Sequence, residues 1–319
     1  MKFVKVTISI LMVFSLFICV GCSNNGTGPE TQDIPLDGRG GGVIIYCYQG
    51  DGLHKIYGIN ADGTGNTRLI NASIGLNHHD ISPNGQRIAC VGYMDAGFNT
   101  WSIHVFNMDG TGLTRLTTVN NVWDNEPRWS PDGSRIAFTR IYPNENDREE
   151  IRVMNSDGTN QHSIGVDGTL GGWSPDGTRF IYTSNSGGNY EIFSCNVDGT
   201  DMQQISSTPE HENFASYSPD GSQIAGSTFE GPLYNSNNAH TFEIFVMNSN
   251  GTNRQQLSNN NNFDGSPRWS PDGTQIAFGS DRHQTAKWEV YIMNADGSNI
   301  RRITNFPSGV TGINPVWRP

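Results

Sequence analysis

The sequence is poor in apolar and in charged residues. Hydrophobic types make up 34% of its 319 residues, and Asp, Glu, Lys and Arg together only 16%. A polytopic membrane protein is excluded, because each spanning helix needs about 20 predominantly apolar residues. Acidic residues outnumber basic ones by 31 to 20, for a formal net charge of -11. The basic footprint of a nucleic-acid-binding protein is therefore missing, and we expect no nucleic-acid partner.

Catalytic consensus motifs are also missing. The chain has no Gly-x-Ser-x-Gly elbow, no P-loop, no dinucleotide fingerprint after a strand and no His-Glu-x-x-His. Beyond residue 22 it has no Cys-x-x-Cys pair, and Cys47, Cys90 and Cys195 each stand in a short apolar run. Three cysteines cannot all pair with one another, so we expect free, buried thiols.

The N-terminus is typical of a targeting segment. Lys2 and Lys5 precede an apolar run over 6–20, which suits a signal peptide and is short for a spanning helix. The run ends at Cys22 and resembles a bacterial lipoprotein signal, although Cys19 stands where such signals usually have Leu. We expect residues 1–21 to be a signal peptide and Cys22 to be lipidated. The alternative is ordinary cleavage that leaves Cys22 free.

Residues 22–42 have no apolar periodicity and are rich in Gly and Asn, as in a flexible tether. Together with the lipid signal, this tether predicts a head anchored in the bacterial cell envelope by lipid only. Ser23 follows the lipidated Cys in place of the Asp that commonly retains lipoproteins at the inner membrane. The expected location is therefore the outer membrane, or a site facing the periplasm.

Helix-favouring Leu, Ala, Glu and Lys are scarce, whereas two turn motifs recur throughout the chain. Trp-Ser-Pro-Asp-Gly or a variant of it is present at 81–85, 129–133, 173–177, 217–221, 269–273 and, truncated, 317–319. The prolines of successive copies are 44 to 52 residues apart. Between them lie six copies of Asn-x-Asp-Gly or Asn-x-Asn-Gly, at 60–63, 107–110, 155–158, 196–199, 248–251 and 294–297.

Each motif suits a tight turn between antiparallel strands. Pro presets the second turn position, Asp bonds its own backbone, and Gly accepts a left-handed conformation. One unit is then four antiparallel strands in the period of a propeller blade. The first unit lacks its first strand, which is found at 314–317. We therefore predict an all-β, six-bladed β-propeller over 43–319, whose ring the C-terminal strand closes.

These repeats resemble the TolB-type propeller family, which carries the same Trp-Ser-Pro-Asp-Gly and Asn-x-Asp-Gly elements. The resemblance covers nearly all of 43–319 and implies the fold. It does not imply one function, because related repeats serve in binding proteins, peptidase accessory domains and some polysaccharide lyases. TolB itself has an additional N-terminal α/β domain, for which we expect no room in this chain.

The repeated residues have a structural interpretation. The turn acids recur once per blade, as turn chemistry requires and catalysis does not. Trp129, Trp173 and Trp269 occupy the same place in their units, so we expect them to pack between blades; the alternative is a stacking platform for sugars.

Residues that the repeat does not dictate are the candidates for function. They fall in the segments that precede each innermost strand, which we interpret as loops converging on one mouth of the central channel. Five residues before the Trp position stand acids, and four before it stand amides, with histidines close by. The candidate binding residues are Asp124, Glu212, Asp264, Asn77, Asn125, Asn213, His78, His79 and His211.

Three interpretations of this mouth compete: a solvated polar rim, a protein-docking surface, or a divalent-cation site of histidines with a carboxylate. We favour docking by a monomeric, non-enzymatic module without a cofactor, whose partner is an envelope protein or a peptidoglycan-associated one. Asp124, Glu212 and Asp264 would be its electrostatic contacts, and Asn125 and Asn213 its hydrogen-bonding contacts. The alternative is a glycan-active protein, either a metal-assisted lyase on acidic polysaccharide or a glycan-capture module.

Two insertions exceed the repeat minimum between the second and third strands of a blade. They lie at 140–149 in blade three and 230–240 in blade five. Such loops are candidates for partner contact, and the alternative is tolerated surface insertion.

Overall fold

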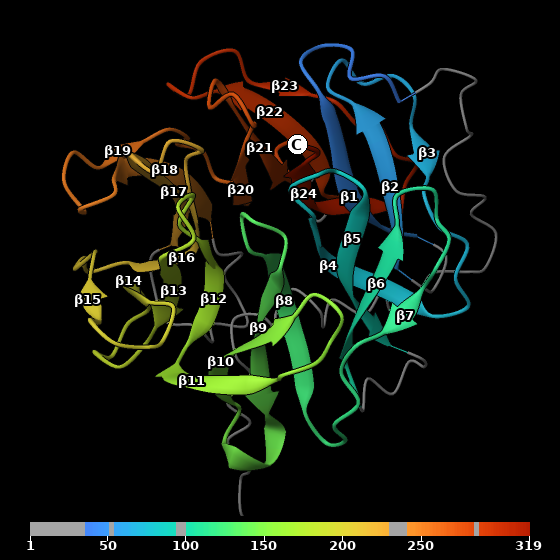
Figure 1. Ribbon diagram of the computed structural model, residues 1–319. Coiled ribbons are helices and arrows are strands. Elements are labelled where there is room, and N and C mark those ends of the chain that lie inside the picture. Colours follow the sequence, from blue (N-terminus) through green and yellow to red (C-terminus); the bar gives the residue numbers. More distant parts are fainter. Residues whose placement is uncertain (1–35, 51–53, 94–99, 230–240, 284–286) are drawn as a thin grey trace, which may run out of the picture.

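The computed structural model describes residues 36–50, 54–93, 100–229, 241–283 and 287–319. They form six four-stranded antiparallel sheets arranged as the blades of a ring (Figure 1). The predicted all-β, six-bladed propeller is confirmed. The predicted signal peptide, Cys22 and the insertion at 230–240 lie outside the described residues. No helix of the described part is long and apolar enough to cross a membrane.

The strands of each blade run in order from the channel outwards. Blade 1 is β24 (Thr311–Trp317), β1 (Val43–Gln49), β2 (Lys55–Asn60) and β3 (Thr67–Arg68). Blade 2 is β4 (Gly75–Ile81), β5 (Arg87–Tyr93), β6 (Ser102–Asn107) and β7 (Thr114–Arg115). Blade 3 is β8 (Trp123–Trp129), β9 (Arg135–Tyr142), β10 (Arg148–Asn155) and β11 (His162–Asp167), with the 3-10 turn η1 (Pro143–Glu145) between β9 and β10.

The other three blades repeat this order. Blade 4 is β12 (Thr169–Trp173), β13 (Arg179–Ser184), β14 (Glu191–Asn196) and β15 (Gln203–Gln204). Blade 5 is β16 (His211–Tyr217), β17 (Gln223–Phe229), β18 (Phe242–Asn248) and β19 (Gln255–Gln256). Blade 6 is β20 (Asp264–Trp269), β21 (Gln275–Ser280), β22 (Glu289–Asn294) and β23 (Arg301–Arg302).

The C-terminal strand closes the ring, as predicted. β24 pairs antiparallel with β1, and Ile44 lies opposite Trp317 in this register. β24 also packs against the innermost strands β20 and β4 of the two neighbouring blades. The two ends of the propeller are thereby joined within one sheet, so that blades 1 and 6 cover each other's apolar faces.

The repeated turns have the structural role expected of them. In one, Asp132 Oδ1 accepts hydrogen bonds from Ser130 Oγ at 2.5 Å and from Ser134 N at 3.0 Å. Gly133 completes this turn with a φ of 70°, a conformation that suits glycine. In the other motif, Asp157 Oδ1 accepts from Thr159 N at 2.9 Å. These bonds stabilise the charged carboxylate and hold each turn closed.

Packing between blades also follows the prediction. Trp129, Trp173 and Trp269 are buried, and Trp173 Nε1 donates to the Arg128 carbonyl of the preceding blade at 3.0 Å. The Arg135 guanidinium of blade 3 lies 4.8 Å from the centre of the Trp173 ring in blade 4.

Free thiols are found at the three predicted cysteines, all of them buried: Cys47, Cys90 and Cys195.

The turn carboxylates give stability a dependence on acid pH. Hydrogen bonds, first from a serine side chain and then from the backbone, lower the pKa of Asp132 and of Asp220 from 3.8 to about 2. A lowered native pKa contributes stability above the ordinary pKa, and this stability is lost as pH falls from about 4 to about 2. A D132N/D220N variant should be less stable than wild type at pH 7, with a gap that shrinks towards pH 2. Urea unfolding at several pH values measures the gap, and a gap independent of pH would contradict the prediction.

Ring closure makes Trp317 important for the stability of the whole propeller. Its side chain is buried, and Nε1 donates to the Arg268 carbonyl of blade 6 at 3.2 Å. W317A should lower the free energy of unfolding by about 3–5 kcal/mol, as for other buried tryptophans. M202A is the control, because Met202 is 63% exposed. Equal urea midpoints for the two variants would show that this closing contact contributes little.

Candidate functional site

The central channel is lined by the six innermost strands, and in all six the pairing register shifts within the strand, as at a bulge. Five of these bulges, in β4, β8, β16, β20 and β24, share one backbone conformation. A residue at each of these bulges has a φ between 34° and 55°, a conformation uncommon outside glycine. The bulge residues together line one cavity of about 10 Å³: His78, Glu126, Phe214, Ser266 and Asn314. The fold thus sends one side chain from each of these blades towards the channel, whatever its chemistry.

The three predicted acids lie within the innermost strands and not in loops before them, which corrects the sequence interpretation of these segments. Asp124, Glu212 and Asp264 are buried, at 0–1% exposure. Each carboxylate can be buried because it pairs with an arginine of its own blade, which compensates its charge.

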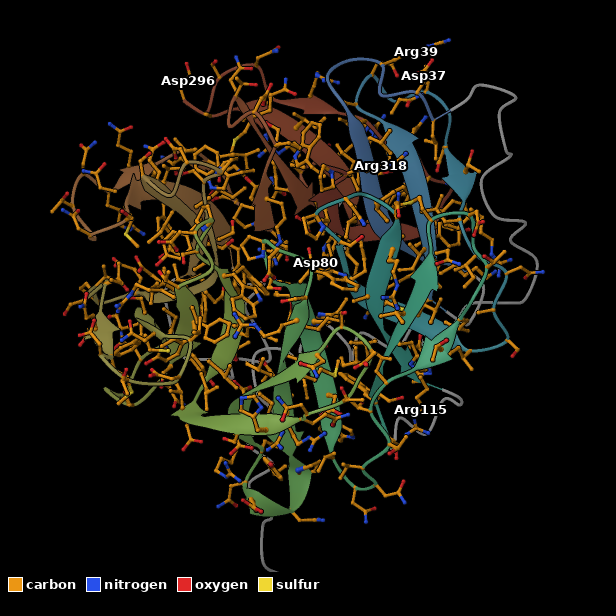
Figure 2. The ribbon with its side chains drawn as sticks, viewed as in Figure 1. Asp37, Arg39, Asp80, Arg115, Asp296 and Arg318 are labelled. Carbon is orange, nitrogen blue, oxygen red and sulfur yellow. The ribbon has the colours of Figure 1, made fainter. Side chains whose placement is uncertain are left out.

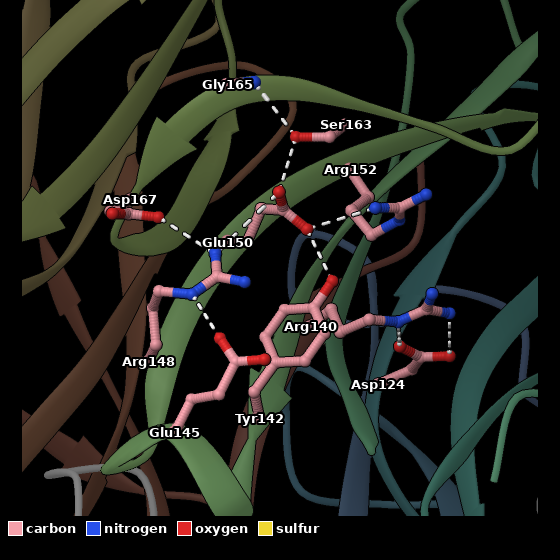
Figure 3. Close-up of polar contacts among 10 residues, drawn as sticks. All are labelled: Asp124, Arg140, Tyr142, Glu145, Arg148, Glu150, Arg152, Ser163, Gly165 and Asp167. Carbon is pink, nitrogen blue, oxygen red and sulfur yellow. Dashed lines mark hydrogen bonds and ion pairs between the residues drawn. The ribbon is translucent and has the colours of Figure 1, made fainter. Parts of the chain in front are cut away.

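Figure 3 shows the pair in blade 3, where Arg140 Nε and Nη2 donate to the two Asp124 oxygens at 2.6 and 2.9 Å. In blade 5, Arg254 Nε donates to Glu212 Oε1 at 2.8 Å. Each of these carboxylates therefore has a structural partner already.

In blade 6 the Asp264 carboxylate accepts hydrogen bonds from both an arginine and a serine. Arg282 Nη2 donates to Asp264 Oδ2 at 2.6 Å, and Ser280 Oγ donates to Oδ1 at 2.5 Å. A direct contact of the three acids with a partner stays a prediction. Such a contact would have to reach carboxylates that arginines already neutralise.

The predicted amides are buried near the channel. Asn77 Oδ1 accepts from His78 N at 2.8 Å. The side-chain amide atoms of Asn125 and Asn213 have no protein hydrogen-bond partner among the described residues. Buried polar atoms are costly when unpaired, so these amides are candidates for hydrogen bonds with water or a ligand group. Asn213 lines a cavity of about 30 Å³.

The structure separates the predicted histidines. His78 Nδ1 lies 2.6 Å from Glu126 Oε1, and the neighbouring His79 is buried, which lowers its pKa to about 4. His211 lies in blade 5, where its Nδ1 accepts from Tyr190 N at 3.1 Å and its ring stacks on Phe229. Within the described ranges no group of three or more His, Cys, Asp or Glu is placed to hold a metal ion.

Three charged residues that line the channel, Glu126, Arg128 and Arg268, were not among the candidates named from the sequence. Arg128 and Arg268 line both cavities, and Glu126 pairs with Arg128 Nη2 through its second oxygen. Burial alone would raise the pKa of Glu126, but Arg128 and then His78 hold it well below its usual range. Asp80, near the centre of the ring in Figure 2, accepts from Trp129 N at 2.7 Å. The sequence feature that could have pointed to the two channel arginines is the triplet Pro-Arg-Trp, present at 127–129 and 267–269.

A row of aromatic rings in contact was also missed; three of its four ring pairs are stacked and the Phe242–Phe263 pair is tilted by 50°. The row joins blades 5 and 6 at the end of the channel where the innermost strands begin, which is the mouth predicted to carry function. Successive ring centres are 4.6–4.8 Å apart in this aromatic ladder: His211, Phe229, Phe242, Phe263 and Trp288. Its members flank strand ends at corresponding places in the blades, a pattern that could have been read from the repeat alignment.

The insertion at 140–149 is tied to its own blade (Figure 3). Glu150 Oε2 accepts from Tyr142 OH at 2.7 Å and Glu150 Oε1 accepts from Ser163 Oγ at 2.7 Å. Arg148 reaches Asp167 on the outermost strand β11 at 3.3 Å. Partner contact by this loop stays a prediction.

A family model described as the TolB beta propeller domain matches residues 80–232 and 143–319, more than half of the chain. The chain belongs to this TolB beta-propeller family. A relative named Protein TolB homolog, from Chlorobium chlorochromatii, is 29% identical over 31% of this chain and 30% of its own length. The match therefore spans less than a third of that relative.

Solved structures share the fold. TolB from Acinetobacter baumannii has a TM-score of 0.71 at 18% identity, over 87% of this chain and 67% of that one. An oligogalacturonate lyase in complex with manganese has a TM-score of 0.56 at 12% identity, over 88% of this chain and 79% of that one. At these identities the likeness concerns the fold alone.

The Asp124–Arg140 pair should be worth more to stability than to recognition. D124N leaves the buried Arg140 guanidinium without its counter-charge, which should cost about 3–5 kcal/mol of unfolding free energy. A D124N/R140M double variant should recover part of this loss. R148Q is the control, because the Arg148–Glu145 pair of the same blade is exposed and worth about 0–1 kcal/mol. Urea unfolding compares the three, and a D124N loss no larger than that of R148Q would refute the structural role.

Proposed function

We propose that this chain is an envelope-anchored TolB-like propeller that acts as a non-enzymatic protein-binding module at its channel mouth. Family membership supports a propeller that serves as a binding scaffold. The N-terminal sequence supports a lipid anchor at Cys22 and a tether over 22–42. The partner is an envelope protein or a peptidoglycan-associated one, and the module works as a monomer.

The observation that carries the proposal is the aromatic ladder at the mouth. Phe229, Phe242 and Phe263 are buried, while Trp288 is only partly buried at the end of the row. The rings of Phe263 and Trp288 are stacked at 15°, so Trp288 is held rigidly by its neighbour. Aromatic side chains held in this way are common anchors at the centres of protein interfaces, because they present a large apolar area at low entropic cost.

The mouth also offers room beside the ladder. A cavity of about 30 Å³ there is lined in part by Tyr190, Asn213 and Phe214. A partner side chain that packs on Trp288 could therefore be followed by a smaller group entering the channel. In this arrangement the paired acids Asp124, Glu212 and Asp264 position the strands of the mouth through their arginine partners, rather than forming new ion pairs.

The alternative is glycan capture at the same mouth. It is favoured by the Phe263–Trp288 stack, because a rigid, partly exposed aromatic face also binds sugar rings. The lyase form of the alternative has weaker support. The manganese-bound lyase shares this fold, but the described residues of this chain bring together only the His78–Glu126 pair at the channel bulges.

Partner capture with a matched pair of variants tests the proposal. The full chain, W288A and M202A would each be immobilised and exposed to native envelope extract. We expect one protein to be retained by the wild type and M202A and to be lost by W288A, because only Trp288 belongs to the ladder. Circular dichroism checks that W288A is folded. Equal retention by both variants would refute the mouth as the docking site, and retention of an acidic oligosaccharide in place of a protein would establish the alternative.

A further inference from the structure

The triplet Pro-Arg-Trp is present on the innermost strands of blades 3 and 6, which lie half a ring apart. It places Arg128 and Arg268 at equivalent positions, so that both reach the channel from opposite sides and line both cavities. The bulge residue two positions earlier differs between the blades. It is Glu126 in blade 3 and Ser266 in blade 6.

Arg128 has a partner at each of the three nitrogens of its guanidinium. Its Nη2 pairs with Glu126, its Nε donates to the Gly171 carbonyl at 2.9 Å, and its Nη1 donates to the Pro127 carbonyl at 3.0 Å. The charge of blade 3 is therefore neutralised within the blade itself, and Glu126 is occupied from the other side by His78.

Arg268 has no such neutralisation. Its Nη1 reaches only the Pro267 carbonyl at 3.5 Å, and no ion pair joins it to a carboxylate of the described part of the chain. Burial, and next the like charge of Arg128, lower the pKa of Arg268 to about 9, although Glu126 and Asp80 attract the charge through space and partly offset this effect. The group stays charged at neutral pH. The Asp80 carboxylate acts on Arg268 only through space, because its hydrogen bond is with the Trp129 backbone N–H of blade 3.

Further donors surround this charge. Ser266 Oγ donates to Asn314 Oδ1 at 3.3 Å, which orients the amide so that Asn314 Nδ2 is left without a protein partner among the described residues. Asn213, 5% exposed, likewise has an unpartnered Nδ2 and lines the larger cavity with Arg268. A guanidinium with amide donors beside it is an arrangement that binds planar oxyanions.

We propose that the channel holds a carboxylate-binding site centred on Arg268, in which an external carboxylate takes the place that Glu126 fills in blade 3. The larger cavity, of about 30 Å³, has room for about two water-sized groups, which is the size of the two oxygens of a carboxylate; the smaller one, of about 10 Å³, is at the limit for a single water. The carboxylate therefore belongs to a small free acid or to the tip of a partner's acidic side chain. Because a free acid satisfies the site as well, it goes beyond the docking role proposed above.

Acetate is the probe that tests this site. The thermal midpoint of the full chain would be measured against acetate concentration at pH 7, with sodium chloride holding the ionic strength constant. Binding to the native state should raise the midpoint in a saturable way. R268Q should bind acetate at least tenfold more weakly, as expected for the loss of a charge-assisted hydrogen bond. No saturable rise in the wild type, or an unchanged affinity in R268Q, would overturn the proposal.

Two further variants make the test specific. S266E supplies blade 6 with the carboxylate that blade 3 has, so it should abolish the acetate response while keeping Arg268, and it decides the question if R268Q does not fold. R115Q is the matched control, because Arg115 lies at the periphery of the ring (Figure 2), and it should respond as the wild type does. A full response in S266E would overturn the proposal.

The source of the carboxylate is distinguished by a second ligand. An N-acetylated glutamyl peptide amide that binds at least tenfold more tightly than acetate, and loses this advantage in R268Q, would indicate a partner's side chain. Equal affinities would indicate a free acid, and both results support the site. W288A separates the two proposals, because it should lose partner capture while keeping the acetate response.

Discussion

The pairing of β24 with β1 is the constraint on which the rest of the structure depends. Without it, blades 1 and 6 would each expose an apolar face, and the inter-blade packing of the tryptophans would have no closed circuit. Closure also fixes the channel. Arg128 and Arg268 reach the same two cavities because the ring holds their blades opposite one another. The pairing of β24 with β1 thus determines the geometry of a site to which β24 itself contributes Asn314.

Within this ring, the bulge separates what the fold dictates from what it leaves open. The backbone at the bulge is alike in five innermost strands, whereas the side chains range from His78 and Glu126 to Phe214 and Ser266. Packing dictates the Trp positions and hydrogen bonding dictates the turn acids, so their chemistry repeats. The bulge residues face the channel and are free to differ, and the difference between Glu126 and Ser266 is what makes one side of the channel unlike the other.

The fold could be predicted from the sequence because its determinants are local. Turn chemistry, the spacing of the repeats and the displaced strand at 314–317 require no knowledge of distant contacts. The site was predicted only in part. Asp124 looked like a free carboxylate because its partner Arg140 lies on the next strand, where register decides the pairing. The repeat alignment could have shown that aromatic residues recur at strand ends of blades 5 and 6, but contact between rings of two blades depends on how the blades pack.

The two proposed elements of the site would make different demands on a ligand. Trp288 and the ladder offer an apolar surface, against which many apolar groups can pack. Arg268 offers a charge that no carboxylate of the described residues contacts directly, and leaving a buried charge without such a contact is costly, as the provision of Glu126 for Arg128 illustrates. A bound amide or alcohol would not neutralise Arg268, whereas a bound carboxylate would. The ladder would therefore contribute affinity, and the channel arginine would select for negative charge.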